Sequence, residues 1–288
     1  MAKENENIPD PEKMGRTDSP ARQYFLPSQI VKTFAEKGKD HLERNVLAQF
    51  ILSLKAGAFM TFGAVFSILL VIGIQAKGAG YLLSGLEFAT GYAMVFLTGA
   101  ILFTEVNVLL PTYLFQRPNW SYQLYLKFWA STYVGNIAGA FFAAVIIIAS
   151  SSLNKGFEHE LNVFLSHKMG FLEHGAWGWF QIMLSGIVAN WLIGMAAFLT
   201  TAARDIIGKM IGTLLPVTLF VAGNFQHSAA NMGYFSLGVL ASNHYSWYQY
   251  LLYNLIPASI GNIIGGAVLV SLLFSFAYKK EIRNTNES

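Results

Sequence analysis

Two stretches of this sequence decide its fold, because they match one another. The first is Gly99-Ala-Ile-Leu-Phe-Thr-Glu-Val-Asn107, and the second is Gly223-Asn-Phe-Gln-His-Ser-Ala-Ala-Asn231. In both, a hydroxyl residue follows the glycine after five positions and an asparagine follows it after eight. Both stretches place polar or helix-unfriendly residues in the middle of a long apolar run. We therefore expect two broken helices in equivalent positions.

A second pair of motifs extends the match. Gly135-Asn-Ile-Ala-Gly139 and Gly261-Asn-Ile-Ile-Gly265 follow the first glycines by 36 and 38 residues. The chain is thus a duplication, with repeats at about 46–154 and 174–278. Each repeat has three apolar spans, and an odd number makes the second copy enter a membrane from the opposite side. Such inverted repeats are typical of transporters and channels.

The composition requires a membrane protein. Of 288 residues, 54% are hydrophobic and 12% charged, with mean hydropathy +0.44, whereas soluble domains average about 25% charged residues. Residues 1–45 hold 16 of the 35 charges and residues 279–288 hold five. The excess basic residues lie beside apolar spans, so we expect no nucleic-acid partner. The absence of cysteine excludes disulfides, thiolate metal sites and cysteine nucleophiles.

Six stretches are long enough to cross about 30 Å of hydrocarbon, which takes about 20 apolar residues. The second and fifth contain the breaks. We therefore predict an all-α integral membrane protein whose transport domain, 46–278, holds six transmembrane helices as two inverted three-helix repeats. The spans are about 46–75, 83–115, 128–153, 177–201, 210–240 and 250–278.

The ends are expected to be polar and cytoplasmic. Residues 1–24 have no apolar stretch and are predicted to be disordered, and residues 25–45 to form an amphipathic interfacial helix capped by Ser28. The segments on the side of both termini, which include residues 1–45 and the tail 279–288, carry fifteen Lys and Arg residues. The connections on the other side carry three. The positive-inside rule then places both termini in the cytoplasm, in the cell membrane.

Irregular backbone at membrane depth must be buried in protein or face a watery cavity, since each unpaired group costs several kcal/mol in hydrocarbon. The two breaks should therefore face inward. Their helix N-termini favour anions. The alternative is a pair of glycine-rich kinks in packed helices, which would not explain why the polar positions match.

These residues form a known pattern. The stretch from Phe220 to Met232, which contains His227, and the stretch from Asn254 to Gly266 closely resemble the formate/nitrite transporter family. Leu102-Phe103-Thr104 and Phe25-Leu26-Pro27 do so as well. The resemblance implies a homopentamer of aquaporin-like protomers in the lipid bilayer. Each protomer would have its own pore for small anions or their conjugate acids, such as formate, nitrite, hydrosulfide, acetate or lactate, and would need no cofactor or metal.

His227 is the only histidine inside a predicted span. An ionisable side chain within a membrane is a functional candidate, although a satisfied core histidine is the ordinary alternative. The resemblance implies that His227 is a central pore histidine, hydrogen-bonded to Asn190 and close to Thr104. Because burial favours the neutral form of a carboxylic acid, we expect a small anion to be protonated near His227 and to cross as the neutral acid, coupled to protons.

The resemblance also implies a set of constrictions and an anion-attracting lysine. Lys168 would attract anions from the outer vestibule, unless it is an ordinary solvated loop charge. Tyr92 departs from the smaller aliphatic residue usual in the family. The constrictions would be Leu102, Tyr92, Ile193 and Phe220 towards the cytoplasm, with Phe88 and Phe103 towards the outside.

Two charges within the spans are without a clear role. Glu105 follows Thr104 at a depth where a carboxylate is costly unless it is paired or neutral. Lys55 lies ten residues, about 15 Å, into the first span, where an ion pair with Glu105 is conceivable. A structural pair and a role in proton or substrate handling both stay open. Asn136 and Asn262, beside small-xxx-small steps, are expected to make interhelical hydrogen bonds.

Other functions are disfavoured by what the sequence lacks. It has no G-x-S-x-G or H-E-x-x-H motif of a membrane enzyme. It also lacks the paired Asn-Pro-Ala motifs of aquaporins, and ammonium channels typically have a pair of pore histidines. A nitrite or hydrosulfide channel of the same family remains an alternative to a monocarboxylate transporter, and a non-transporting membrane scaffold a more distant one. Channel and proton symport are not distinguished by the sequence.

Overall fold

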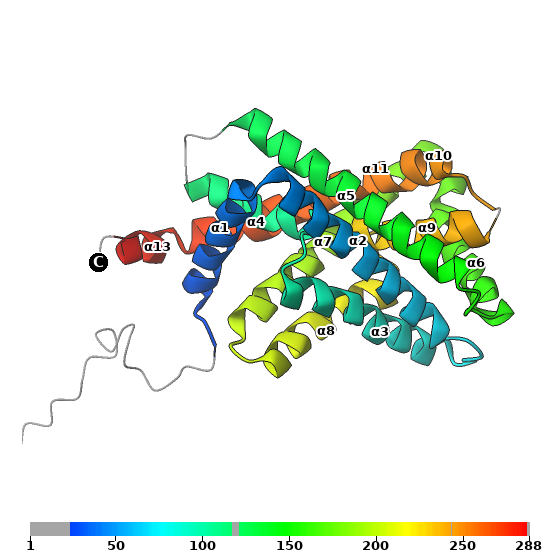
Figure 1. Cartoon of the computed structure of the whole chain (residues 1–288). Helices are drawn as coiled ribbons and strands as arrows, with labels where there is room; N and C mark the ends of the chain where they lie inside the picture. The colour runs from blue at the N-terminus through cyan, green and yellow to red at the C-terminus, as the bar shows by residue number, and fades with distance from the viewer. Residues whose placement is uncertain (1–23, 117–120, 243, 287–288) are drawn as a thin grey trace, which may run out of the picture.

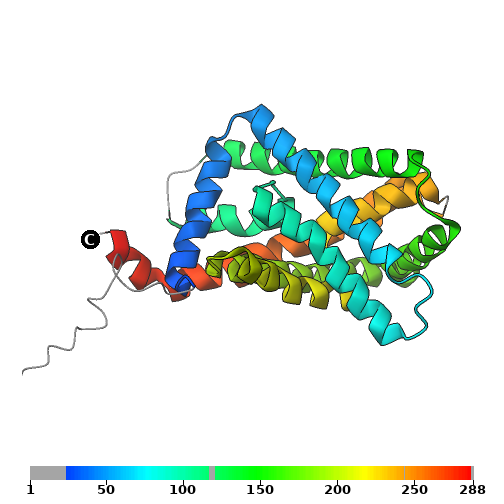
Figure 2. The same cartoon turned by 60° about the horizontal axis from the view of Figure 1, so that its bottom comes forward.

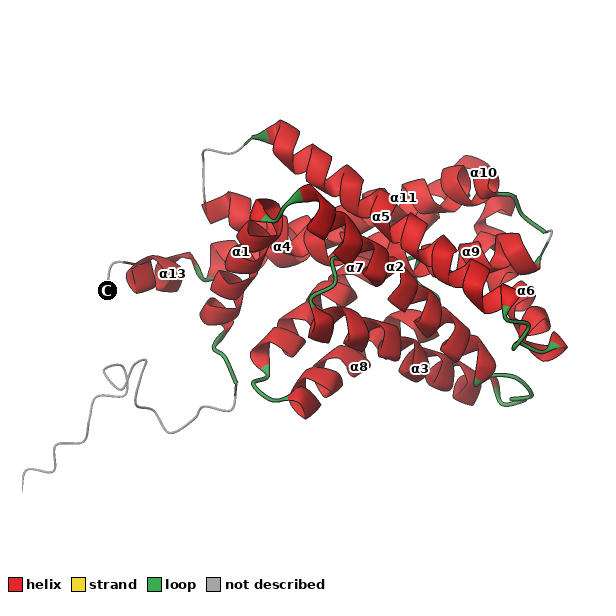
Figure 3. Ribbon diagram, in the orientation of Figure 1, coloured by secondary structure: helices red, strands yellow, loops and turns green. Residues whose placement is uncertain are grey.

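The described part of this computed structural model comprises residues 24–116, 121–242 and 244–286, and its regular elements are all helices (Figures 1 and 3). An isolated antiparallel bridge joins Tyr24 to Ala203. The expectation of disorder for residues 1–24 falls outside the described residues, apart from Tyr24. The all-α fold class is confirmed.

Helix α1, Pro27–Glu43, lies across one end of the bundle (Figure 2). The prediction that Ser28 caps it is wrong, because the helix begins one residue earlier. Leu26 is the N-cap residue, and its N–H donates to the Gln29 side chain at 2.9 Å. Pro27 fits the first helical position because its missing N–H would have no partner there.

The remaining helices form the bundle. Five apolar stretches are long enough to cross a membrane, and the shorter apolar helix Ile206–Ala222 accompanies them among the described residues. The count of six spans and their inverted insertion stay predictions. The elements are α2 Val46–Leu69, α3 Lys77–Thr98, α4 Phe103–Gln116, α5 Tyr122–Ala149, α6 Lys155–Met169, η1 Gly170–His174, α7 Gly175–Ala202, α8 Ile206–Ala222, α9 Ser228–Ala241, α10 Trp247–Tyr250, η2 Leu251–Leu255, α11 Ile256–Ile264, η3 Gly265–Leu272, α12 Leu273–Ala277 and α13 Lys279–Asn286.

The two described ends of the chain lie at the same end of the bundle. Figures 1 and 2 both show α1 and α13 there. Ile282 of α13 joins the buried cluster that Ile30, Val31 and Phe34 of α1 form with Val108 and other residues. The position of both termini on one side agrees with the Lys and Arg count, whereas their cytoplasmic orientation stays a prediction.

The helices are interrupted at both matched stretches. Helix α3 ends at Thr98, Gly99 has a left-handed φ of 69°, and α4 begins at Phe103. Helix α8 ends at Ala222 and α9 begins at Ser228. In this second segment Asn224 has a φ of 52°, a conformation that asparagine adopts more readily than most residues.

Asn136 of α5 fixes the segment between α3 and α4. Its side-chain oxygen accepts from the Phe103 N–H at 2.8 Å, at the start of α4. Its amide donates to the Ser53 carbonyl of α2 at 2.8 Å and to the Ile101 carbonyl at 3.0 Å. One buried side chain thus satisfies two backbone groups that the interruption leaves without helical partners, Phe103 N–H and Ile101 C=O, and ties them to α2.

Asn262 of α11 does the same for the segment between α8 and α9. Its oxygen accepts from the Ser228 N–H at 2.8 Å, and its amide donates to the carbonyls of Gly186 and Gln226 at 2.8 and 3.1 Å. The expected interhelical bonds of both asparagines are confirmed. The backbone groups that the two asparagines bind are equivalent in the two repeats. Ile101 corresponds to Gln226 and Phe103 to Ser228, each 125 residues apart, one more than the 124 residues between Gly99 and Gly223.

Glycines let the asparagine-bearing helices come close to their neighbours. A Cβ on Gly139 of α5 would meet the Leu54 carbonyl of α2, and one on Gly265 would meet the Ile187 carbonyl of α7. Close backbone contact at small residues is the typical way in which membrane helices pack. It brings Asn136 and Asn262 within reach of the two interruptions.

Candidate functional site

His227 lies at the start of α9, where the second interruption ends. The side chain is fully buried, and its Nδ1 accepts from the Ala230 N–H at 3.3 Å. It therefore acts as the N-cap of α9. The short polar segment before α9 places the ring inside the protein, which agrees with the expectation that the breaks face inward.

Tyr92 of α3 is the side chain that meets this imidazole. Its hydroxyl lies 3.0 Å from both ring nitrogens, and the two ring centroids are 5.7 Å apart. Because Nδ1 accepts from Ala230, a neutral ring carries its hydrogen on Nε2, which can donate to the Tyr92 oxygen. The sequence identified Tyr92 as a constriction, but not as the partner of His227.

The other expected constriction residues fall into two groups. Phe88 and Phe220 pack edge to face at 5.8 Å, and each lies about 6.0 Å from Tyr92. Leu102 and Ile193 belong to the same buried cluster. None of these five residues is more than 1% exposed, so the cluster is closed to water in this conformation.

Phe103 lies elsewhere. Its ring packs on Tyr133 at 4.8 Å and on Trp129 at 5.9 Å, both from α5. Phe88, in contrast, stacks on Tyr234 at 5.5 Å. The two phenylalanines that we expected towards the outside therefore have different ring partners, and their role as constrictions stays a prediction.

Thr104 and Asn190 lie next to each other. The Asn190 amide donates to the Thr104 carbonyl at 3.1 Å and to the Asn262 carbonyl at 2.7 Å. The expected hydrogen bond between Asn190 and His227 is therefore wrong, because the Asn190 amide donates to these two backbone carbonyls instead. Thr104 Oγ1 and Asn190 Oδ1 are buried and have no hydrogen-bond partner among the described residues. Such atoms are rare in native proteins and point to a ligand or water position.

Lys168, near the end of α6, is buried rather than solvated. Only 2% of the residue is exposed. Its ammonium donates to the Phe225 carbonyl at 2.9 Å and lies 5.4 Å from the centre of the Phe164 ring. Phe225 belongs to the same interruption as His227. The structure therefore excludes the ordinary loop charge and brings the cation to the segment that carries the histidine.

Three buried amide side chains join Lys168 to this segment, those of Gln226, Asn231 and Asn254, and none of them was among the predicted site residues. Asn231 donates to Gln226 at 2.9 Å and to Asn254 at 2.7 Å, and Asn254 donates to the Lys168 carbonyl at 3.1 Å. A signal was present, since all three amide side chains lie within or beside apolar spans.

Glu105 and Lys55 are not brought together. Lys55 is exposed on α2, whereas Glu105 is 7% exposed in the first turn of α4. The ion pair that joins two described residues elsewhere is Lys39–Glu43, at 3.6 Å. The conceivable pair of Glu105 with Lys55 is therefore wrong.

The comparisons with known proteins agree with the residue patterns. The family model described as "Formate/nitrite transporter" matches residues 28–276. The chain is 32% identical over 247 residues to the "Probable formate transporter" of Methanothermobacter thermautotrophicus, covering 80% of this chain and 89% of that protein. It is 29% identical over 280 residues to the "Formate channel FocA" of Escherichia coli (strain K12), covering 89% and 95%.

Two solved structures have a similar fold. The "Pentameric formate channel with formate bound" has a TM-score of 0.67 and 24% identity, and the match covers 81% of this chain and 98% of that chain. The "FNT family ion channel" has a TM-score of 0.77 and 21% identity, covering 87% and 99%.

Proposed function

Because this chain belongs to the formate/nitrite transporter family, which comprises channels and transporters rather than enzymes, we propose that it carries formate and similar small monocarboxylates together with protons. It is a multi-pass membrane protein, and we place it in the cell membrane with both termini in the cytoplasm. Nitrite and hydrosulfide are the alternative substrates.

The observation that carries this proposal is the presence of buried polar side chains at both interruptions. A buried imidazole lies in an interrupted helix. Two buried side-chain oxygens without partners, Thr104 Oγ1 and Asn190 Oδ1, belong to the residues that meet at the other interruption. Such oxygens can accept or, in the case of the threonine, donate a hydrogen bond to a small polar molecule.

The chemistry follows from the cost of burying charge. An isolated carboxylate loses tens of kcal/mol of solvation in a medium of low dielectric constant, so it is neutralised instead. In the proposed mechanism, the buried ammonium of Lys168 attracts the anion towards the interruption. Desolvation there raises the pKa of the carboxylic acid, and a proton joins the substrate beside His227. The neutral acid then passes the apolar cluster.

The aromatic cluster limits the size of what can pass. Phe88, Tyr92 and Phe220 have ring centroids within about 6 Å of one another and exclude water in this conformation. Passage therefore needs side-chain movement, which costs least for a small molecule. This favours formate over bulkier acids such as lactate.

The protomer is proposed to be aquaporin-like and to assemble as a homopentamer. The proposal is supported by the fold that this chain shares with a pentameric formate channel. It is also supported by the many large apolar side chains exposed on single helices, such as Phe62 and Phe66 of α2.

Flux measurements in proteoliposomes test the function. We expect uptake of radiolabelled formate that is faster with an inward proton gradient, slower uptake of lactate and still slower uptake of nitrite. His227→Asn should abolish the effect of the gradient. His159→Asn, which changes an exposed histidine on α6, is the matched control and should leave it unchanged.

The other outcomes separate the alternatives. Nitrite uptake faster than formate uptake would favour the nitrite channel. Full gradient-driven formate uptake by His227→Asn would exclude this histidine as proton donor. No flux of any of these anions would support the non-transporting scaffold.

A further inference from the structure

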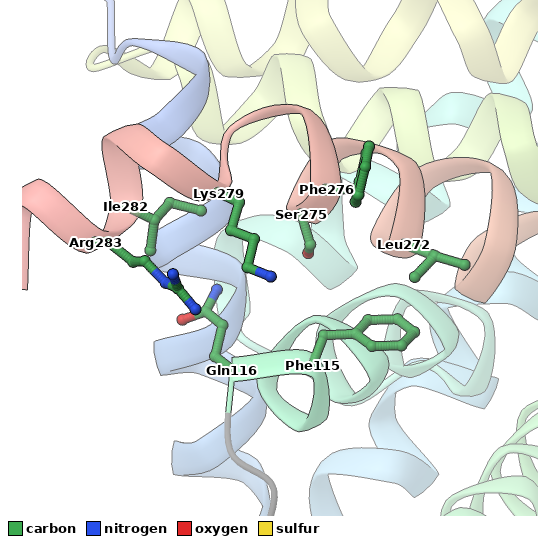
Figure 4. Close-up of a pocket in the computed structure, with 8 residues that line it drawn as sticks. All are labelled: Phe115, Gln116, Leu272, Ser275, Phe276, Lys279, Ile282 and Arg283. Carbon is green, nitrogen blue, oxygen red and sulfur yellow. The ribbon is translucent and has the colours of Figure 1, made fainter.

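A second candidate site lies far from His227, at the end of the bundle where α1 and α13 meet. It is a cavity of about 340 Å³ between the end of α4, α12 and α13 (Figure 4). None of the pathway residues lines it. Apolar residues line one part of the cavity, and polar and cationic residues line the other.

The lining changes from apolar to cationic along the chain. Leu272, Phe276, Lys279 and Arg283 all line the cavity, and a turn at Tyr278 separates the first two from the last two, which belong to α13. The first two belong to the predicted sixth span, and the last two to the predicted cytoplasmic tail. Phe276 is 77% exposed and Phe115, across the cavity on α4, is 53% exposed. The apolar part is therefore open to the surroundings, which at this depth are lipid.

The polar part gathers hydrogen-bond donors without a carboxylate. The lining includes the Lys279 ammonium, the Arg283 guanidinium, the Gln116 amide and the Ser275 hydroxyl, and no Asp or Glu is among the described residues that line it. Figure 4 shows the side chains of Gln116, Lys279 and Arg283 directed towards one space.

Two of these donors are buried and unused. Gln116 Nε2 and Ser275 Oγ have no hydrogen-bond partner among the described residues, and Ser275 is only 9% exposed. Two cations and two free donors around one space match an oxyanion with several oxygens, such as a phosphate group. The open apolar side next to it matches hydrocarbon chains.

We propose that this cavity binds an anionic phospholipid of the cytoplasmic leaflet. The phosphate headgroup accepts hydrogen bonds from Lys279, Arg283, Gln116 and Ser275, and the acyl chains lie along Phe115 and Phe276. Basic pockets between helices at the cytoplasmic face are typical sites for acidic headgroups. The inference relies on the predicted orientation of the tail, but it does not depend on which anion the protein transports.

Native mass spectrometry of the full-length protein tests this inference. The protein is purified from membranes, exchanged into detergent and titrated with phosphatidylglycerol or phosphatidylcholine. We expect retained phosphatidylglycerol to exceed retained phosphatidylcholine. Lys279→Gln/Arg283→Gln should weaken phosphatidylglycerol binding by about twenty-five-fold, the product of about fivefold for each cation near an anionic lipid.

Matched controls keep the test specific. Lys39→Gln/Lys280→Gln removes the same charge from exposed positions on α1 and α13 that do not line the cavity, and should bind phosphatidylglycerol as the unchanged protein does. Formate uptake by both double variants should persist, which shows that they fold. If the unchanged protein takes up no formate, this result contradicts the proposed function and leaves the test of lipid binding unaffected.

Three results would overturn the proposal. The first is equal phosphatidylglycerol binding by the cavity variant and the control variant. The second is no preference over phosphatidylcholine together with complete displacement by inorganic phosphate, which would identify a site for free phosphate. The third is a change of oligomeric mass in the cavity variant without bound lipid, which would show that a second copy covers the cavity.

Discussion

At the scale of single residues, the position of His227 depends on two contacts from different elements. The Ala230 N–H fixes Nδ1 from within α9, and the Tyr92 hydroxyl approaches from α3. Tyr92 also packs against Phe88 and Phe220. In the proposed pathway, this one side chain both orients His227 and narrows the passage, and two substitutions can separate these effects.

Tyr92→Phe removes the hydroxyl and keeps the ring, whereas Tyr92→Leu removes both. We expect Tyr92→Phe to slow formate uptake by about tenfold and to change its pH profile, because a buried ring nitrogen loses its partner. Only Tyr92→Leu should raise lactate uptake relative to formate. Flux of both acids from pH 5 to 8 is the measurement, and the same lactate-to-formate ratio in both variants would contradict a role in size selection.

Glu105 is a buried carboxylate for which the described residues provide no ion-pair partner. It lies in the first turn of α4, where the helix dipole favours a negative charge. The cost of burying an unpaired charge exceeds this dipole contribution, so we expect Glu105→Gln to keep the pH profile of formate uptake and not to lower thermal stability. A displaced pH optimum would instead assign Glu105 to proton handling.

His41 of α1 makes stability depend on pH. Burial, then the charges of Arg44 and Lys37, lower its pKa in the folded protein to about 4, against 6.5 for a free histidine. The unfolded chain binds the proton first, so stability is fully present above about pH 6.5 and falls as the pH approaches 4. Melting curves should show that the free energy of unfolding falls by about 3 kcal/mol over this pH range. His41→Leu should remove this part of the pH dependence.

At the scale of elements, each interrupted helix pair is held by an asparagine from a neighbouring helix. Asn136 joins α5 to α2 and α4, and Asn262 joins α11 to α7 and α9. These bonds satisfy carbonyl and N–H groups that would otherwise be unpaired in the interior. They therefore keep the non-helical segments in one conformation, which the candidate site requires.

Asn136→Leu and Asn262→Leu should each destabilise the protein by about 2 kcal/mol or more, because each leaves two buried backbone groups of an interruption unpaired. Formate uptake should fall with the loss of folded protein. Thermal melting in detergent is the measurement. Asn162→Leu on α6, a partly exposed position, is the control, and an equal effect there would show that the bonds at the interruptions are not special.

At the scale of the whole molecule, much of the protomer surface is apolar, and Lys55 is exposed on α2 within it. A lysine facing hydrocarbon near the middle of a span costs about 2.5–3.5 kcal/mol. Contact with neighbouring copies can cover such a surface. The formate channel of similar fold is pentameric, and we propose the same assembly here.

Native mass spectrometry should give an assembly of five 31.8 kDa chains. The mass should stay the same on moderate dilution in mild detergent, because an apolar interface between membrane proteins buries closely packed side chains. A monomer as the main species, under conditions in which formate uptake is retained after reconstitution, would contradict the assembly.

The sequence alone was enough for the features that depend on composition and spacing. Apolar length predicted the helical membrane fold, and the repeated glycine and asparagine motifs predicted the two interruptions. The same motifs predicted the interhelical bonds of Asn136 and Asn262. These features are readable because the cost of unpaired backbone in hydrocarbon leaves few alternatives.

Only the tertiary structure decided which side chains meet. It replaced the expected partner of His227, Asn190, by Tyr92, gave Phe103 and Phe88 different ring partners, and left Glu105 apart from Lys55. It also brought Lys168 to the carbonyl of Phe225. Contacts between spans depend on the rotation and tilt of each helix, which are set by packing against all of its neighbours and not by the spacing of residues along one segment.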